Sequence, residues 1–374
     1  MNREILKENL NLKKQENNFR SLKVFDKNMV NLSSNDYLFL AHDEVLKKDF
    51  IDKYLSEFSF SSSSSRLITG TYDIVSHLEK RIEEIYKKPA LVMNSGFCAN
   101  KTIIETFYNK NSLILTDRLN HASIYAGIVS STSRFLRYKH LDMENLESLL
   151  EKYRKDYDDI LIVSESVYSM DGDTADLKKL VEIKKKYNAD LMIDEAHSFG
   201  VYGYGIAYKE NLVKDIDFLC IPLGKGGGSV GAYVICEQDF KDYIINYGKE
   251  FIYSTALPPV NNLWNLYILN NMKNFDEKIK KLEDLKNYTL NLMKKMNIDT
   301  VSDSQIIGLV IGSNNKTDMI TEKLRQKGWL VYGIKSPTVP KGGERIRISL
   351  HSEITKDKIK NFLEDFKNEC NTVF

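Results

Sequence analysis

The sequence lacks an excess of charge of either sign and any long apolar run. Its 374 residues include 53 lysines and arginines against 52 acidic residues, which gives a formal net charge of +1. Without a basic excess the chain has no general attraction for nucleic acid. No stretch reaches the roughly 20 apolar residues that a membrane helix needs. We therefore expect neither a nucleic-acid partner nor a membrane-embedded protein.

Cysteine is also scarce. The four cysteines lie far apart, with no CxxC pair, at Cys98, Cys220, Cys236 and Cys370. This spacing excludes a disulfide framework and fits four free thiols in a reducing compartment. The first residues, MNREILKENLNLKKQENN, lack the apolar core of a signal peptide. The six histidines show no metal-ligand spacing. We expect a cytoplasmic protein without a metal site.

What the sequence does contain is an alternation of short apolar runs with amphipathic helical patterns. The predicted strands are 90–94, 112–116, 160–166, 190–194, 218–223 and 232–236. Between two of them, residues 176–188 place Leu177, Leu180, Val181 and Ile183 near one helical face. Strands that are apolar throughout and alternate with helices indicate a mostly parallel sheet covered on both faces. The predicted fold class is therefore α/β.

The pattern changes near residue 260. A long helical stretch, about 259–295, is followed by three strand-like runs and a final helix, at 306–312, 329–334, 345–350 and 355–369. We predict an N-terminal helix and segment, a large α/β domain and a smaller α+β C-terminal domain, with bounds 1–45, 46–258 and 259–374. The serine-rich stretch 59–67 is typical of a flexible loop.

The most unusual stretch is CIPLGKGGGSVGAY, residues 220–233, in which Lys225 lies among glycines. It is not a nucleotide-binding P-loop, because Leu219 and Gly226 occupy the positions that require glycine and Ser or Thr. A linker is also excluded, since apolar runs flank the stretch on both sides. Two interpretations remain open: a lysine with space beside it for a bulky ligand, and a tight turn with a solvated lysine.

A second stretch, LMIDEAHSFG at 191–200, ends another apolar run with Asp194 and His197. Parallel sheets bind ligands at the carboxyl ends of their strands, and a buried carboxylate there needs a cation or a strong donor. Asp194 and Lys225 match the needs of pyridoxal phosphate. A lysine forms a Schiff base with its aldehyde, and an acid pairs with its ring nitrogen. An ordinary strand-end turn would carry the same short Asp-x-x-His pattern.

Two further stretches fit a cofactor of this shape. NSGFCAN, 94–100, follows a predicted strand and opens a helix, so its N–H groups could hold a phosphate beside Gly96 and Phe97. DRLNHAS, 117–123, places His121 at the same sheet edge, where an imidazole could lie against a planar ring. An ordinary strand-to-helix turn and a structural histidine explain each stretch equally well when it is taken alone.

Nine stretches in order resemble the motifs of one family, the α-oxoamine synthases, over about residues 20 to 365. They are SSNDYL (33–38), SRLITGTYDIVSHLE (65–79), NSGFCAN, DRLNHAS, SESVYSMDGD (164–173), DEAHSFGVYG (194–203), LGKGGGSVGAY (223–233), FIYSTALPP (251–259) and SPTVPKGGERIRISL (336–350). The resemblance implies a fold-type I pyridoxal-phosphate enzyme that joins an amino acid to an acyl-CoA and releases carbon dioxide. The stretches MDGD, STALPP and PTVP favour the branch of biotin synthesis, which uses L-alanine and a pimeloyl thioester of CoA or acyl carrier protein.

Other activities share these motifs. The nearest are glycine C-acetyltransferase, 5-aminolevulinate synthase and serine palmitoyltransferase. A fold-type I aminotransferase or lyase would also carry the Asp194 and Lys225 pair, although it does not need STALPP. A non-catalytic partner subunit is a third possibility, and the presence of Lys225 argues against it.

The resemblance also implies roles for individual residues. Those expected to be catalytic are Lys225, His121 and Asp194. Those expected to contact the cofactor are Gly96, Phe97, His121, Ser169, Asp194, His197 and Lys225, with Ser254 and Thr255 reaching the phosphate of the neighbouring subunit in a homodimer. Those expected to contact the substrate are Arg20, His121, Thr338 and Arg347, of which Arg347 would clamp the amino-acid carboxylate.

The sequence departs from the family pattern at three places. Pro222 stands where members usually carry Thr or Ser, whose hydroxyl bonds the phosphate, so about 1.5–3 kcal/mol of cofactor affinity should be lost unless another group substitutes. Lys335 replaces an arginine common in the biotin branch and lacks the planar fork of a guanidinium. The loop before Arg66 is serine-rich in place of glycine-rich.

Overall fold

The computed structural model describes residues 2–57 and 59–373. Within them the chain forms two compact units, which are described separately. The large unit comprises residues 35–169 and 174–281. The small unit comprises the residues up to Ser34, residues 170–173 and the residues from Leu282 onward. The division at residue 281 falls inside helix α12 (Asp276–Lys295).

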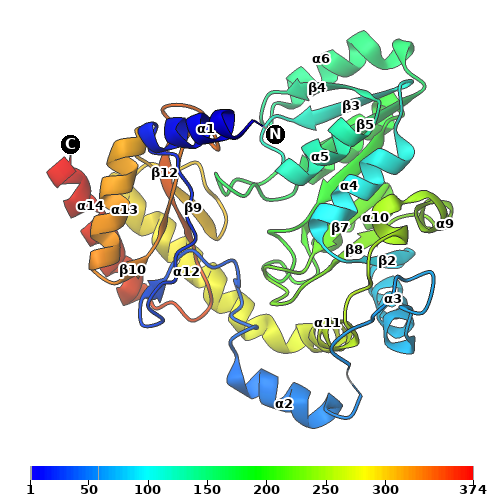
Figure 1. The fold of residues 1–374 in the computed structure, drawn as a ribbon, viewed down its shortest axis with the longest axis horizontal. Coiled ribbons are helices and arrows are strands. Elements are labelled where there is room, and N and C mark those ends of the chain that lie inside the picture. The colour runs from blue at the N-terminus through cyan, green and yellow to red at the C-terminus, as the bar shows by residue number, and fades with distance from the viewer. Residues whose placement is uncertain (1, 58, 374) are drawn as a thin grey trace. The chain divides into compact units, whose positions relative to one another are not determined.

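A seven-stranded sheet forms the centre of the large unit (Figure 1). In spatial order its strands are β2 (Ala90–Met93), β8 (Ala232–Ile235), β7 (Phe218–Pro222), β6 (Asp190–Asp194), β5 (Asp159–Glu165), β3 (Ser112–Asp117) and β4 (Arg134–Tyr138). Strand β8 runs antiparallel to both of its neighbours, and the pairs from β7 to β4 are parallel. The sheet is therefore mostly parallel, as the sequence predicted.

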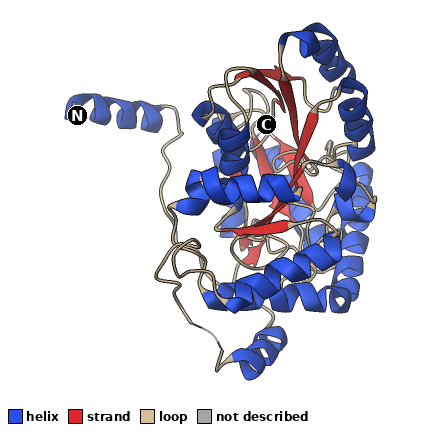
Figure 2. Ribbon diagram, turned by 90° about the vertical axis from the view of Figure 1, so that its right-hand side faces the viewer, coloured by secondary structure: helices blue, strands red, loops and turns tan. Residues whose placement is uncertain are grey.

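Helices connect the strands and cover both faces of this sheet. Their bounds are α2 (Glu44–Tyr54), α3 (Asp73–Tyr86), α4 (Gly96–Phe107), α5 (Ala122–Ser130), α6 (Met143–Tyr153), α7 (Leu177–Tyr187), α8 (Ile206–Lys209), α9 (Gln238–Tyr247), α10 (Lys249–Ile252) and α11 (Pro259–Asn271). Connections between parallel strands are right-handed. The chain moves across the sheet in one direction from β2 through β3 to β4, and in the opposite direction from β4 through β5 to β6. Helices α4 and α5 therefore lie on one face of the sheet, and α6 and α7 lie on the other. The contacts between α4 and α5, and between α6 and α7, agree. Figure 2 shows the strands lying between helices.

The six strands predicted for the large unit are confirmed to within two residues at each end. Helix α7 is also confirmed: Asp176 caps its start by accepting from the Lys179 N–H, and Asn188 ends it in the left-handed conformation. Strand β4 was not predicted. It forms the sheet edge, and most of its residues are exposed, so the stretch RFLRY has no apolar run to reveal it.

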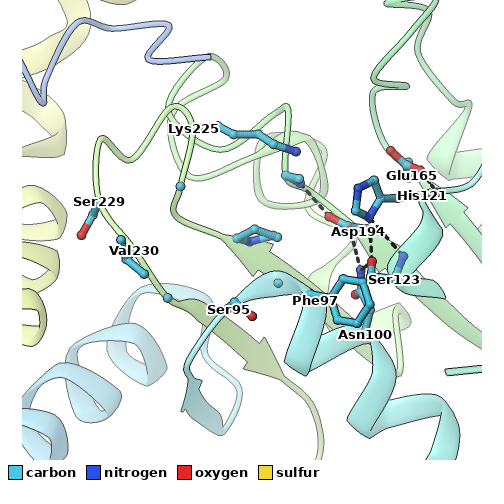
Figure 3. Close-up of a pocket in the computed structure, with 15 residues that line it drawn as sticks. Ser95, Phe97, Asn100, His121, Ser123, Glu165, Asp194, Lys225, Ser229 and Val230 are labelled. Carbon is cyan, nitrogen blue, oxygen red and sulfur yellow. Dashed lines mark hydrogen bonds between the residues drawn. The ribbon is translucent and has the colours of Figure 1, made fainter. Parts of the chain in front are cut away.

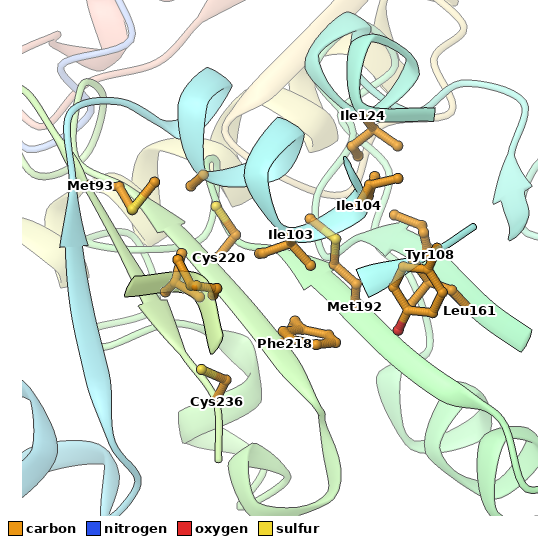
Figure 4. Packing of buried hydrophobic residues seen from close by; sticks show 14 of the residues in the cluster. Met93, Ile103, Ile104, Tyr108, Ile124, Leu161, Met192, Phe218, Cys220 and Cys236 are labelled. Atoms are coloured by element: carbon orange, nitrogen blue, oxygen red, sulfur yellow. The ribbon is translucent and has the colours of Figure 1, made fainter. Parts of the chain in front are cut away.

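Apolar side chains fill the space between the sheet and helices α4 and α5 (Figure 4). Met192 and Phe218 come from the sheet, Ile103 and Ile104 from α4, and Ile124 from α5, and all are at most 1 % exposed. Burying each such side chain stabilises the fold by roughly 1.5–3 kcal/mol. This packing fixes the starts of α4 and α5 against the ends of the strands.

The small unit contains an antiparallel sheet of β11 (Tyr332–Ile334), β12 (Arg345–Ser349) and β9 (Ile306–Val310). A short parallel pair joins β1 (Val30–Asn31) to β10 (Trp329–Leu330). The helices are α1 (Arg3–Gln15), α13 (Asn314–Gln326), α14 (Lys356–Val373) and the second part of α12. The three strand-like runs and the final helix predicted here are confirmed, the run 329–334 being divided between β10 and β11.

Two further findings concern the residues that the structure describes. None of their helices combines the length and the apolarity needed to cross a membrane. All four cysteines are free thiols, as their spacing predicted.

Candidate active site

A cavity of about 250 Å³ opens at the carboxyl edge of the large sheet. Four parallel strands end there, at Asp117, Glu165, Asp194 and Pro222. The cavity is lined by Ser95, Gly96, Phe97, Asn100, His121, Ser123, Glu165, Asp194, Ala196, Pro222, Gly224, Lys225, Ser229, Val230 and Gly231. Figure 3 shows the Lys225 side chain extending toward the cluster of Asp194, His121, Ser123 and Asn100. The edge predicted for ligand binding is therefore hollowed.

Asp194 is the last residue of β6 and is only 3 % exposed. Its Oδ2 accepts from Asn100 Nδ2 at 2.6 Å, and its Oδ1 accepts from the backbone N–H of Ala196 at 2.8 Å. Both oxygens of the buried carboxylate therefore have a hydrogen-bond donor. These two bonds fix the acid at the cavity wall.

His121 precedes helix α5 and caps it, because its Nδ1 accepts from the Ser123 backbone N–H at 3.3 Å. The same ring nitrogen lies 2.8 Å from Ser123 Oγ, which in turn accepts from Asn100 Nδ2 at 2.9 Å. The backbone N–H of His121 donates to Glu165 at 2.5 Å. The imidazole is therefore fixed by both the helix start and strand β5.

Lys225 lies in the loop between β7 and β8, and its Nζ lies 2.9 Å from His197 Nε2. On the other side of the ring, His197 Nδ1 lies 2.6 Å from Tyr37 Oη, and that hydroxyl donates to Asn35 Oδ1 at 3.1 Å. An ammonium can only donate, so the ring proton of His197 belongs on Nδ1. This chain of contacts holds the lysine amine at one place in the cavity.

The glycines nearby make room for the protein's own chain. A Cβ at Gly96 would lie 2.5 Å from Pro222 Cγ, and one at Gly226 would lie 2.1 Å from the Phe199 carbonyl oxygen. The sequence interpretation gave the glycines around Lys225 the role of leaving space for a bulky ligand. The structure shows that Gly96 lets the start of α4 pack on the end of β7, and that Gly226 lets the Lys225 loop pack on the segment after β6.

Burial and neighbouring charges shift two pKa values in the cavity. Burial, followed by the charge of Asp194, raises the pKa of the Glu165 carboxyl, and the positive charge of Lys225 partly opposes this. Burial lowers the pKa of His121; the Asp194 charge opposes the shift and the Lys225 charge adds to it. At neutral pH the cavity therefore favours a neutral imidazole and a neutral Glu165 side chain.

The cavity gathers five of the predicted site residues: Gly96, Phe97, His121, Asp194 and Lys225. His197 reaches it through Lys225. The other predicted cofactor contacts in the large unit, Ser169, Ser254 and Thr255, do not line it.

Thr255 lies close to strand β2. Its carbonyl oxygen accepts from Asn94 Nδ2 at 2.6 Å, and it forms a β-bridge with Ser65. The predicted substrate contacts Arg20, Thr338 and Arg347 all belong to the small unit. Within it Arg20 Nη2 donates to Thr338 Oγ1 at 3.4 Å, and Arg347, on β12, is 8 % exposed.

Sequence reasoning missed five polar residues that line the cavity: Ser95, Asn100, Ser123, Glu165 and Ser229. Each lies within a motif that was singled out, yet none has a chemical role that its own type reveals. Asn100 lies one helical turn after Gly96 in α4, so a helical count from Gly96 would have placed it on the cavity side. Glu165 is signalled only by its position at the end of a strand that is buried after its first residue.

The cavity wall suits a polar, anionic ring compound. Asn100 Oδ1 and Ser229 Oγ are buried and have no hydrogen-bond partner among the described residues, so a bound polar group would satisfy them. The cavity is also lined by Lys225, Asp194 and His121, which supply the amine, the acid and the imidazole that pyridoxal phosphate needs. Within residues 2–57 and 59–373, no group of three or more His, Cys, Asp or Glu side chains is arranged to hold a metal ion.

A lysine and a buried acid in one cavity, at the carboxyl edge of a mostly parallel sheet, define a class: the fold-type I enzymes that use pyridoxal phosphate. The comparison with protein families agrees with this class. Residues 27–366 match the aminotransferase class I and II family, so the chain belongs to that family.

Curated relatives make the relationship more specific. A protein of Neisseria meningitidis serogroup A (strain Z2491) is 43 % identical over 340 residues, covering 89 % of this chain and 90 % of the relative. One of Haemophilus influenzae (strain 86-028NP) is 42 % identical over 344 residues, covering 90 % of each. Both carry the provisional name 8-amino-7-oxononanoate synthase.

Solved structures share the fold over nearly the whole chain. Serine palmitoyltransferase from S. paucimobilis superposes with a TM-score of 0.89 at 25 % identity, covering 98 % of this chain and 97 % of that one. The 8-amino-7-oxononanoate synthase of Francisella tularensis gives a TM-score of 0.78 at 28 % identity, covering 93 % and 99 %. The resemblance to the α-oxoamine synthases is thereby confirmed, and with it the α/β fold class and the cofactor.

Proposed function

We propose that this enzyme condenses L-alanine with a pimeloyl thioester, of CoA or acyl carrier protein, in biotin biosynthesis. The products are 8-amino-7-oxononanoate, carbon dioxide and the free thiol. The observation that carries the proposal is the 42–43 % identity, over about nine tenths of the chain, to relatives named for this reaction. The cavity supports it, because Lys225 and Asp194 meet there.

The described residues would hold the cofactor as follows. Lys225 would bind the aldehyde covalently, and the Asp194 carboxylate would pair with the ring nitrogen. His121 would lie beside the ring, and His197, already in contact with Lys225, would bond the phenolic oxygen. Pyridoxal phosphate, when bound, withdraws electrons from the substrate carbon that bears the amine. The start of α4 at Gly96 and Phe97 offers backbone N–H groups to the phosphate.

The chain's own residues would then move the proton. Once the substrate amine has displaced it, the Lys225 amine is free to take the proton from the α-carbon of alanine. Asp194, whose two oxygens accept from Asn100 Nδ2 and the Ala196 N–H, would pair with the ring nitrogen and favour its protonated form. The carbon that loses its proton would form the new bond to the thioester carbonyl, and the thiol would leave. The same carbon would then lose its carboxylate as carbon dioxide, and Lys225 Nζ would return a proton to it in place of that group.

Several parts of the proposal come from the family resemblance. Arg347 would clamp the substrate carboxylate, with Arg20 and Thr338 contributing to substrate binding, and Ser169 would contact the cofactor. Ser254 and Thr255 would serve the phosphate of the partner subunit in a homodimer, which fits the exposure of the adjacent Tyr253 at 82 %. We place the enzyme in the cytoplasm. The bounds 1–45, 46–258 and 259–374 remain our proposal for the domains.

A sibling condensation is the second candidate, because the serine palmitoyltransferase fold superposes with the higher TM-score. Sequence identity favours the alanine reaction, at 43 % against 25 %. Identity reports side chains, which set substrate choice, whereas the TM-score reports backbone alone.

Mass spectrometry of the product tests the proposal. The purified enzyme with pyridoxal phosphate is given L-alanine and pimeloyl-CoA, and in parallel L-serine with palmitoyl-CoA and glycine with acetyl-CoA or succinyl-CoA. We expect 8-amino-7-oxononanoate from the first pair as the dominant product. Faster thiol release from another pair would replace the proposal by the corresponding sibling activity.

A further inference from the structure

A chain of hydrogen bonds links the acid of the cavity to its imidazole. It runs from Asp194 Oδ2 to Asn100 Nδ2 at 2.6 Å, on to Ser123 Oγ at 2.9 Å, and ends at His121 Nδ1 at 2.8 Å (Figure 3). Asn100 and Ser123 are each 1 % exposed, so water does not compete for these bonds. The chain connects three elements: β6, α4 and the start of α5.

The chemistry of each group fixes the direction of these bonds. The ionised Asp194 can only accept, so the amide nitrogen of Asn100 must face it. The second N–H of the same amide donates to Ser123 Oγ. The hydroxyl hydrogen of Ser123 is then available to donate to His121 Nδ1. The Ser123 backbone N–H also points to Nδ1, at 3.3 Å. A ring nitrogen that accepts from two donors carries no proton of its own.

We propose that Asn100 and Ser123 are positioning residues that hold His121 as the neutral tautomer with its proton on Nε2. The inference rests on the proposed function, since it concerns the imidazole assigned to the cofactor ring. A neutral imidazole puts no positive charge beside a protonated ring nitrogen. Asp194 can then keep that nitrogen protonated without opposition from a second cation.

The titratable groups that face His121 belong to three elements. Asp194 at the end of β6 and Lys225 in the loop after β7 act on its ring, and Glu165 at the end of β5 accepts its backbone N–H. Asp194 favours an imidazolium, and Lys225 disfavours it. Burial of the ring, the main influence on its pKa, favours the neutral form. The bonds of Asn100 and Ser123 then fix the position of the single ring proton, because a hydrogen on Nδ1 would face the hydrogens of two donors.

Nitrogen NMR of the full chain labelled with ¹⁵N-histidine measures the tautomer directly, in the protein freed of cofactor. The His121 signal is assigned by its loss in His121→Gln. We expect Nε2–H in the wild type, and in Ser123→Ala and Asn100→Ala a mixture of tautomers with a His121 pKa closer to the ordinary histidine value. The cofactor dissociation constant should rise about tenfold in both, the equivalent of one hydrogen bond.

Two further variants distinguish positioning from packing. Ser123→Thr keeps the hydroxyl and should keep the wild-type tautomer. Asn262→Ala removes a buried asparagine of α11 that does not line the cavity, and should leave the His121 signal and the cofactor affinity unchanged.

An unchanged His121 tautomer and pKa in both Ser123→Ala and Asn100→Ala would overturn the inference, whatever happens to turnover. If Asn100→Ala does not fold, the Ser123→Ala and Ser123→Thr pair decides the question. Because the tautomer is read without substrate or cofactor, a failure of the alanine reaction with the expected NMR result would count against the proposed function alone.

Discussion

At the residue scale, single side chains of the cavity serve both the fold and the site. Ser95 caps α4 by accepting from the Cys98 N–H, and His121 caps α5. Replacing a helix cap costs about 1 kcal/mol of stability. A loss of activity in variants of Ser95 or His121 therefore has to be separated from a loss of structure. Lys225 caps no helix, so its chemistry can be tested more cleanly.

Lys225→Ala should lower turnover by at least about a thousandfold, because it removes both the covalent anchor and the base. Lys179→Ala is the control: Lys179 is a partly exposed lysine of helix α7 that does not line the cavity, and its loss should leave turnover unchanged. Thiol release from pimeloyl-CoA with L-alanine measures the effect. Substantial turnover in Lys225→Ala would remove the basis of the assignment.

Glu195, the residue after Asp194, makes stability depend on pH. Its Oε1 accepts from the Ala207 N–H at 2.8 Å, and its Oε2 is buried without a partner among the described residues. Burial raises the pKa of Glu195 to about 8. Because the folded state binds a proton that the unfolded state has already lost, this group's contribution to stability falls as the pH rises from about 4.5 through about 8.

The unfolding free energy of the wild type should therefore fall between pH 6 and pH 9, and the fall should be smaller in Glu195→Gln by on the order of 1 kcal/mol or more. Urea unfolding at the two pH values gives the slope. Glu182→Gln changes an exposed glutamate of α7 and should keep the wild-type slope. An equal slope in Glu195→Gln and the wild type would contradict the prediction.

At the element scale, the cavity depends on how the start of α4 meets the end of β7. Pro222 closes β7 and pairs in register with Ala232 of β8. Proline has no N–H to donate to a neighbouring strand, and at the end of a strand this costs few of the sheet's backbone hydrogen bonds. Its ring fills the place where a Cβ of residue 96 would lie. The proline that departs from the family pattern is thus packed against the helix that we expect to hold the phosphate.

Gly96→Ala should destabilise the fold by about 1–3 kcal/mol, because its Cβ would overlap Pro222. Gly224→Ala is the matched control from the same cavity wall, since the nearest atom to its added Cβ is 3.8 Å away. Denaturant unfolding compares the two variants. Equal stabilities would show that the start of α4 adjusts freely.

Pro222→Ser should raise the affinity for pyridoxal phosphate by up to about tenfold, by restoring the hydroxyl that most family members have at this position. Serine is smaller than proline, so it relieves the contact with Gly96. A cofactor titration followed by absorbance measures the change. Unaltered affinity would indicate that another group already replaces the missing hydroxyl.

At the scale of the whole molecule, the proposed homodimer makes a prediction about shared sites. If Thr255 serves the partner's cofactor, each site combines Lys225 of one subunit with Thr255 of the other. In a dimer of one Lys225→Ala subunit and one Thr255→Glu subunit, one site then carries both substitutions and the other site carries neither. Mixing the two inactive variants under conditions of subunit exchange should restore up to about one quarter of wild-type turnover. No recovery, with exchange verified by mass, would place Thr255 in its own subunit's site.

Much of the fold could be predicted because its strands are buried on both faces and therefore read as apolar runs. The cavity residues with a distinctive chemistry, Lys225, Asp194 and His121, were also found. Asn100 and Ser123 were not, since an amide and a hydroxyl gain their roles only from the neighbours that packing gives them. The edge strand β4 was missed because solvent exposure removes its apolar pattern.

The sequence by itself determined the α/β class, the order of the strands along the chain and the residues able to do the chemistry. Only the tertiary structure decided that Lys225 and Asp194 face one cavity, that Gly96 makes room for the Pro222 side chain, and that Gly226 makes room for the backbone at Phe199. The physical reason is that periodicity and residue type are local properties. Distances across the sheet edge depend instead on how β6, β7 and α4 pack together, which no single stretch of sequence records.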